Sequence, residues 1–351
     1  MSGKINLGYE VMDFEQGIMV ENVPLKQFKY NMLISGRDSC DRSAVLSHIL
    51  NQIYVKAPHI GVLLVKLSSN KGACSYNLDK VYEYGDLELE IPYFLEHRFN
   101  DVDREHLINC INAVFGFHFE VKWVMRNVVH HYKLGRFPSS LIDFLEDVKN
   151  YLIEHPYDKE FNDSNIGSIE KAIELVQEDS ILERTIWIPS NLPEWLELWC
   201  EGKKVCIDLS SCDPHYKKIL VAFLFQNLIN FLPHGEADIP SGIVVLEDAD
   251  HVFKEPPHEY YRNTYNEHRS YYEQCREKCY ILTKEQIEEA YGDSNYLLNV
   301  QFENVIRNYI LDEFRYRSIS LINVCENTEK IYKSINSHSR IRVQLKKKNK
   351  R

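Results

Sequence analysis

The segment Gly36–Ser43, which reads G-R-D-S-C-D-R-S, constrains the possible folds of this chain more than any other stretch. It has the length and the end residues of a phosphate-binding loop, G-x-x-x-x-G-K-[ST]. The apolar run Met32–Ile34 precedes it and a helical pattern, Ala44–Tyr54, follows it. The sequence therefore predicts a strand, a loop and a helix in succession, which is the structural context that the motif requires.

Two positions of this loop depart from the motif, because Asp41 replaces the second glycine and Arg42 replaces the lysine. The glycine lets the backbone approach a phosphate closely. A carboxylate about 4 Å from phosphate charge costs roughly 4 kcal/mol at an effective dielectric near 20, which corresponds to about a thousandfold in affinity. Arg42 offers a planar fork in place of a compact ammonium, whereas Ser43 keeps the hydroxyl that would contact magnesium. An ordinary strand–helix turn is the alternative interpretation.

Composition limits the class of protein. The chain has 351 residues, is 44% hydrophobic and carries a formal net charge of −11. This supports one large domain or two smaller ones, and it provides no global basic field to attract nucleic acid. No C-x-x-C pair occurs among the nine cysteines, so we expect no structural zinc. The sequence shows no signal peptide and no apolar run of about 18 residues, so we expect a cytoplasmic protein without a membrane partner.

Periodicity divides the chain into two kinds of region. Residues 1–99 and 186–345 alternate apolar strand patterns with helical ones, which predicts an α/β fold with a mostly parallel sheet flanked by helices. Residues 100–185 show helical periodicity, and we expect an inserted helical subdomain there. Residues 346–351 form a basic tail, which we interpret as a solvated terminus.

A second motif lies at Ile243–Phe253, I-V-V-L-E-D-A-D-H-V-F, where four apolar residues end in two acids. This pattern is typical of a Walker B strand, in which one acid organises magnesium and the other polarises the attacking water. Glu247 and Asp248 would hold these roles in the reverse of the usual order. Each working oxygen is thereby displaced, and about 1 Å of misplacement can cost around a hundredfold in rate. A buried strand that ends in a solvated acidic turn is the alternative.

Taken together, these segments resemble the HerA/FtsK superfamily of hexameric motor ATPases, in particular the HerA-type DNA translocases. The resemblance spans about residues 18–345 and rests on four segments in the family's order: Gly36–Ser43, Val205–Leu232, Val244–Phe253 and Phe314–Leu345. It implies a RecA-like fold, ATP and Mg²⁺ as cofactors, a homo-oligomeric ring such as a hexamer, and double-stranded DNA as a partner.

The resemblance also assigns roles to residues. Arg315 falls near the arginine that reaches a neighbouring subunit's nucleotide, with Arg317 as an alternative, and Glu326 falls near a polar sensor that is usually glutamine. Surface solvation or salt bridging is the other interpretation of both arginines. The implied catalytic residues are Glu247, Asp248 and Arg315. The implied nucleotide-binding residues are Gly36, Asp41, Arg42, Ser43 and Glu326. Ser43 and Glu247 would hold Mg²⁺ if a nucleotide binds.

The departures from the family pattern at these motif residues all affect nucleotide chemistry. The first hypothesis is therefore a motor-fold subunit deficient in hydrolysis, binding ATP weakly or using no cofactor. It would serve as a structural or regulatory component of a DNA-processing or defence complex. Its partners would be a nuclease or another effector, or an active paralogue in a hetero-oligomer.

Two alternatives stay open. The first is a working, ring-forming DNA translocase that uses Arg42, Ser43, Asp248 and Arg315. The second is a nucleotide-independent protein-interaction module, suggested by the tyrosine-rich segment 258–280, because clustered tyrosines favour protein interfaces.

Overall fold

The computed structural model describes residues 4–13, 18–69, 76–87, 108, 111–112, 115, 117, 119–132, 138, 140–155, 159–178, 192–212, 214–233, 235, 237–253, 306, 310–328 and 331–345. The tyrosine-rich segment 258–280 and the tail 346–351 lie outside these residues. The chain divides into two compact units. One comprises Met1–Glu88, Ser190–Glu255 and Ile306–Arg351, and the other comprises Leu89–Pro189 and Pro256–Val305.

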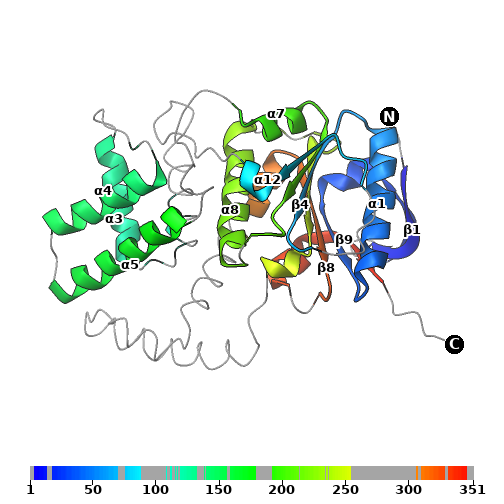
Figure 1. The fold of residues 1–351 in the computed structure, drawn as a ribbon. Helices are drawn as coiled ribbons and strands as arrows, with labels where there is room; N and C mark the ends of the chain where they lie inside the picture. The colour runs from blue at the N-terminus through cyan, green and yellow to red at the C-terminus, as the bar shows by residue number, and fades with distance from the viewer. Residues whose placement is uncertain are drawn as a thin grey trace. The chain divides into compact units, whose positions relative to one another are not determined.

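The first unit is built on a mixed sheet in the order β2-β1-β9-β3-β8-β7-β4-β6-β5 (Figure 1). Its strands are β1 (Lys4–Asp13), β2 (Ile18–Pro24), β3 (Asn31–Ser35), β4 (Gly61–Lys66), β5 (Lys80–Glu83), β6 (Lys204–Asp208), β7 (Gly242–Glu247), β8 (Ile319–Cys325) and β9 (Ser339–Gln344). The seven strands from β9 to β5 pair in parallel, and β1 pairs antiparallel with β2 and β9. The prediction of a mostly parallel α/β sheet is confirmed.

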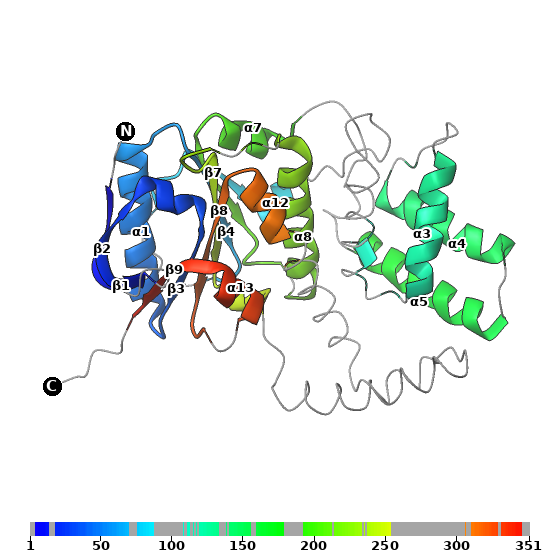
Figure 2. The ribbon, with the colours of Figure 1, turned by 180° about the vertical axis from the view of Figure 1, so that it is seen from behind.

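Helices cover both faces of this sheet. Helix α1 (Ser39–Lys56) lies on one side of the strands, and α8 (Pro214–Phe231) lies on the other (Figures 1 and 2). Two shorter helices, α7 (Glu194–Cys200) and α12 (Leu311–Tyr316), contact β4 and β8 respectively. The near-continuous apolar run at residues 60–67 predicts a strand buried on both faces, and it forms β4, in which five of the six residues, Gly61–Val65, are buried.

Alternate residues of the central strands share one core with α1. Val62 and Leu64 of β4 belong to the same buried cluster as Leu46 and Ile49 of α1. Burying four such side chains contributes about 1.5–3 kcal/mol each relative to exposure. This packing fixes the start of α1 against the carboxyl edge of the sheet.

The second unit contains three described long helices, α3 (Phe119–Tyr132), α4 (Leu141–Glu154) and α5 (Lys159–Glu178). The helical spacing of five apolar residues predicts one buried face for α4, and all five are buried: Leu141, Phe144, Leu145, Val148 and Leu152. Ser140 caps α4 by accepting a 3.1 Å hydrogen bond from the Asp143 amide. Residues 117–121 are the one strand candidate that the sequence offers in this helical region, and that prediction is wrong, because α3 begins at Phe119. Among the described helices, none is both long and apolar enough to cross a membrane.

Candidate functional site

Four parallel strands of the first unit end at the same edge of the sheet. In the register of the sheet, Ser35 of β3 pairs with Cys325 of β8, and Lys66 of β4 pairs with Glu247 of β7. The carboxyl edge of a parallel sheet is the usual location of ligand sites in open α/β folds. The topology therefore brings both sequence motifs together, although they are about 200 residues apart.

The loop between β3 and α1 is short, because the helix begins at Ser39. Asp38 is its N-cap: its Oδ1 atom accepts from the Cys40 amide at 2.8 Å and from the Asp41 amide at 3.3 Å. The Arg42 amide already donates to the Asp38 carbonyl at 3.2 Å. The helical pattern from Ala44 therefore predicted the start too late, and the missed signal was the aspartate–serine pair, a strong N-cap sequence.

This cap changes what the helix start can bind. A phosphate loop directs backbone N–H groups and the positive end of the helix dipole at an anion. Here the Asp38 carboxylate accepts from two of those N–H groups. The half-buried Asp41 lies in the first turn, where a carboxylate is stabilised by the dipole. The Asp38 carboxylate thus takes the acceptor position that a phosphate would need, and Asp41 adds negative charge in the first turn.

Arg42 points back across the loop to the end of β7. Its Nη2 atom lies 2.7 Å from Asp248 Oδ1, and its Nη1 atom donates to the Gly36 carbonyl. The two paired side chains are only 6% and 7% exposed. The Ser68 hydroxyl, at the end of β4, donates to the second carboxylate oxygen of Asp248. Arg42 and Asp248 therefore form a buried, hydrogen-bonded ion pair.

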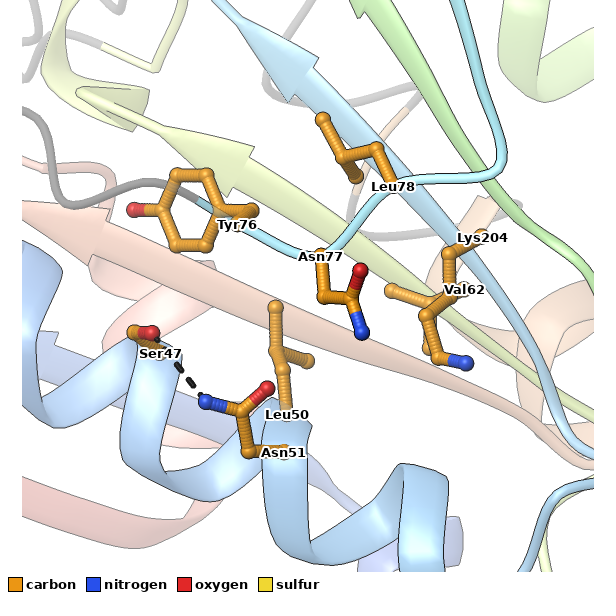
Figure 3. A pocket seen from close by; sticks show the side chains of 8 residues that line it. All are labelled: Ser47, Leu50, Asn51, Val62, Tyr76, Asn77, Leu78 and Lys204. Atoms are coloured by element: carbon orange, nitrogen blue, oxygen red, sulfur yellow. Dashed lines mark hydrogen bonds between the residues drawn. The ribbon is translucent and has the colours of Figure 1, made fainter.

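Ser43 and Glu247 form a second link between the motifs. The Ser43 hydroxyl donates to Glu247 Oε1 at 2.8 Å, and the Tyr76 hydroxyl donates to the same oxygen at 2.8 Å. Figure 3 shows Tyr76 and Asn77 among residues that line a small pocket together with Ser47, Leu50 and Asn51 of α1. Its volume is about 10 Å³, which is room for about one water molecule. The hydroxyl predicted to contact magnesium is thus bonded to the predicted magnesium ligand.

The backbone at Asp248 is unusual. Its φ of 60° and ψ of 49° place it in the left-handed region, which costs a residue with a Cβ roughly 1–2 kcal/mol. The ion pair with Arg42 and the hydrogen bond from Ser68 hold the carboxylate in this conformation. Strained residues of this kind cluster at functional sites.

Gly36 has a packing role at this site. A Cβ atom at this position would lie 2.8 Å from the Cβ of Leu345, just after β9. Its amide donates to the Cys325 carbonyl at 3.2 Å. Burial, with help from the Asp250 carboxylate, raises the pKa of the Cys325 thiol to about 12, so the thiol beside the loop is neutral at physiological pH.

The structure does not bring Arg315 into this site. Arg315 is exposed at the end of α12, before β8 begins, and so lies at the opposite edge of the sheet. Arg317 is buried, pairs with Glu313 and donates from Nε to the Leu232 carbonyl at 2.9 Å. Glu326 is exposed directly after β8, at the same edge as the loop.

Two residues of the site were missed by sequence reasoning. Ser68 could have been found, because it directly follows a predicted strand and polar residues gather at the carboxyl ends of parallel strands. Tyr76 carries no local signal, because its hydrogen bond to Glu247 depends on the fold and not on a sequence pattern.

No family model and no curated protein matches the chain in sequence. Among solved structures, the chain is similar to the bacterial conjugative coupling protein TrwBdeltaN70. The trigonal form in complex with sulphate gives a TM-score of 0.51 at 12% identity, covering 92% of this chain and 72% of that one. The unbound monoclinic form gives 0.50 at 10% identity, with coverages of 91% and 68%. The fold is RecA-like. At this level of identity the similarity shows the fold alone.

As arranged, the residues do not fit a magnesium nucleotide. The N–H groups at the start of α1 have the Asp38 carboxylate as their acceptor, and the Arg42 charge is matched by Asp248. The motif segments bring five carboxylates and two guanidinium groups to this edge: Asp38, Asp41, Glu247, Asp248, Asp250, Arg37 and Arg42. This excess of negative charge opposes a triphosphate.

Proposed function

We propose that the chain is a motor-fold subunit that does not hydrolyse ATP and that acts as a structural or regulatory component of a DNA-processing or defence complex. The supporting observation is that the two motifs are bonded to each other. Arg42 bonds Asp248 at 2.7 Å and Ser43 bonds Glu247 at 2.8 Å, so the loop and the acidic strand end satisfy each other.

The energetics favour the arrangement in which the two motifs are bonded to each other over one in which the loop binds a nucleotide. A phosphate that recruited Arg42 would leave Asp248 as a buried charge without its partner, and such a loss typically costs about 3–5 kcal/mol. Repulsion from Asp41 adds roughly 4 kcal/mol if the carboxylate is about 4 Å from the phosphate. Since each 1.4 kcal/mol is about a tenfold change in affinity, these two effects oppose nucleotide binding strongly.

Assembly is part of the proposal. The fold is similar to that of a conjugative coupling protein, and the resemblance to motor ATPases implies a ring, as a homo-oligomer or together with an active paralogue. A nuclease or other effector and double-stranded DNA are the partners we propose. Light scattering of the purified chain would establish the number of subunits.

Calorimetric titration with a non-hydrolysable ATP analogue and Mg²⁺ tests the site directly. We expect the parent protein to show no Mg²⁺-dependent heat of binding that is lost in the Ser43→Ala variant. The Ser43→Ala variant is the control, because it removes the one hydroxyl of the motif that could contact the metal. Magnesium-dependent binding that Ser43→Ala abolishes would contradict the proposal.

An active ATPase is the second candidate, and one observation favours it. The Ser43 hydroxyl and the Glu247 carboxylate lie 2.8 Å apart, and both are oxygen ligands of the kind that Mg²⁺ prefers. In that function the Arg42–Asp248 pair would open when a nucleotide binds. Steady ATP turnover that Ser43→Ala abolishes would favour this candidate over the first.

A further inference from the structure

A larger pocket lies at the opposite edge of the same sheet. It is formed where β3, β8 and β9 begin, at Asn31, Ile319 and Ser339, and its volume is about 450 Å³. Pockets of roughly 300–1,000 Å³ hold small-molecule ligands. Because these strands run parallel, their starts lie at one edge of the sheet and their ends at the other. The pocket is therefore distinct from the Gly36–Ser43 loop, which follows the end of β3.

The pocket is strongly basic. Four guanidinium or ammonium groups line it, and the lining includes one histidine and one carboxylate, that of Asp312. The positive groups are Lys29, Arg315, Arg340 and Arg342. Such a concentration of positive charge is notable in a chain whose formal net charge is −11, because it focuses a local field of the opposite sign.

An aromatic ring holds two of these cations near each other. The Arg340 guanidinium carbon lies 4.3 Å from the centroid of the Tyr30 ring, and Lys29 Nζ lies 5.6 Å from it. Both distances allow cation–π attraction, which offsets part of the repulsion between the two charges. The cations are therefore positioned before any ligand arrives.

Arg342 is fixed by the backbone of the pocket wall. Its Nε atom donates to the Ser339 carbonyl at 3.1 Å and its Nη2 atom donates to the Asn336 carbonyl at 2.6 Å. Partial burial of this guanidinium removes some of its solvation and lowers its pKa. An anion in the pocket would compensate that loss of solvation.

We propose that this pocket binds the terminal phosphate of a phosphorylated ligand. Arginine forks match phosphate oxygens bidentately, and the exposed Arg315 at the rim would close over the charge that Arg340 and Arg342 hold from inside. The phosphate could be carried by a free nucleotide or by the end of a nucleic-acid strand, which offer the same chemistry.

Calorimetry with three probes tests this site: ADP without Mg²⁺, a short DNA strand with a 5′-phosphate, and the same strand without it. We expect ADP or the phosphorylated strand to bind, and the Arg315→Glu variant to weaken that binding at least tenfold. Lys203→Glu is the matched control, because Lys203 is exposed and does not line the pocket. Adding Mg²⁺ should not strengthen this binding, and Ser43→Ala should leave it unchanged with or without Mg²⁺, which separates this site from the phosphate loop.

The arms of the experiment also identify the source of the phosphate. Binding of ADP alone indicates a free nucleotide, and binding of the phosphorylated strand indicates a nucleic-acid end. The inference is overturned if no probe binds, if the unphosphorylated strand binds as tightly as the phosphorylated one, or if Lys203→Glu weakens binding as much as Arg315→Glu.

Discussion

Arg42 and Asp248, 206 residues apart in the sequence, form a buried ion pair with 2.7 Å between Nη2 and Oδ1. The pair joins the start of α1 to the end of β7, across the intervening strand β8. It links the two segments that the sequence marks as nucleotide motifs. Whether this ion pair stays intact or opens for a nucleotide decides between a structural and a catalytic role for both segments.

Replacing Arg42 by methionine should destabilise the first unit. The substitution removes the charge that compensates Asp248, and removal of one partner of a buried pair costs about 3–5 kcal/mol. Urea unfolding followed by circular dichroism measures the change. The double variant Arg42→Met with Asp248→Asn should recover much of the loss, because no uncompensated charge remains. A cost below about 1 kcal/mol for Arg42→Met would show that Asp248 is solvated or partnered in another way.

The cap at Asp38 can be tested with a matched pair of substitutions. Asp38→Ala should lower the free energy of unfolding by about 1 kcal/mol, since an alanine cannot accept from the Cys40 and Asp41 amides. Asp38→Asn should retain most of the stability, because asparagine caps equally well. Equal losses in the two variants would show that charge rather than capping is what Asp38 contributes.

Alkaline pH should lower the free energy of unfolding of the first unit, because two buried thiols lose their protons. Burial raises the pKa of Cys206, like that of Cys325, from 9.0 to about 12. The folded state therefore holds these protons more tightly than the unfolded state. The resulting stability is complete below about pH 9.0 and is lost as the pH rises toward about 12, with a slope of at most about 1.4 kcal/mol per pH unit for each thiol.

Unfolding at pH 8 and pH 10 would measure this loss. Cys206→Ala should reduce the pH dependence, whereas Cys40→Ala should not, since Cys40 is exposed. Identical pH dependence in Cys206→Ala and the parent protein would contradict the assignment.

The apolar strands could be predicted from sequence because parallel strands buried on both faces have a near-continuous apolar signature. β4, β7 and β8 all follow it, and they are buried along almost their whole length. The acids at Glu247 and Asp248 were correctly placed at a strand end for the same reason. The chain is similar to its structural neighbours in fold, whereas the sequence identity is only 12% in the first comparison.

The contacts between motifs could not be predicted in this way. The Arg42–Asp248 pair depends on the strand order β3-β8-β7, which local patterns do not determine. The start of α1 was misplaced because the motif suggested a long loop, whereas the N-cap preference of Asp38 extends the helix to Ser39. Arg315 was assigned by resemblance to a neighbouring subunit's nucleotide, and its place before β8 puts it at the other edge of the sheet from the loop of its own chain. Its role in an assembly stays a prediction.

ATP turnover by the purified protein tests the central claim most directly. The assay would compare the parent chain with Ser43→Ala, each with Mg²⁺ and with or without duplex DNA. We predict equal background rates in both proteins and no stimulation by DNA, because the Arg42–Asp248 and Ser43–Glu247 bonds keep the two motifs engaged with each other. Turnover that DNA stimulates and that Ser43→Ala abolishes would contradict the claim and establish a working motor.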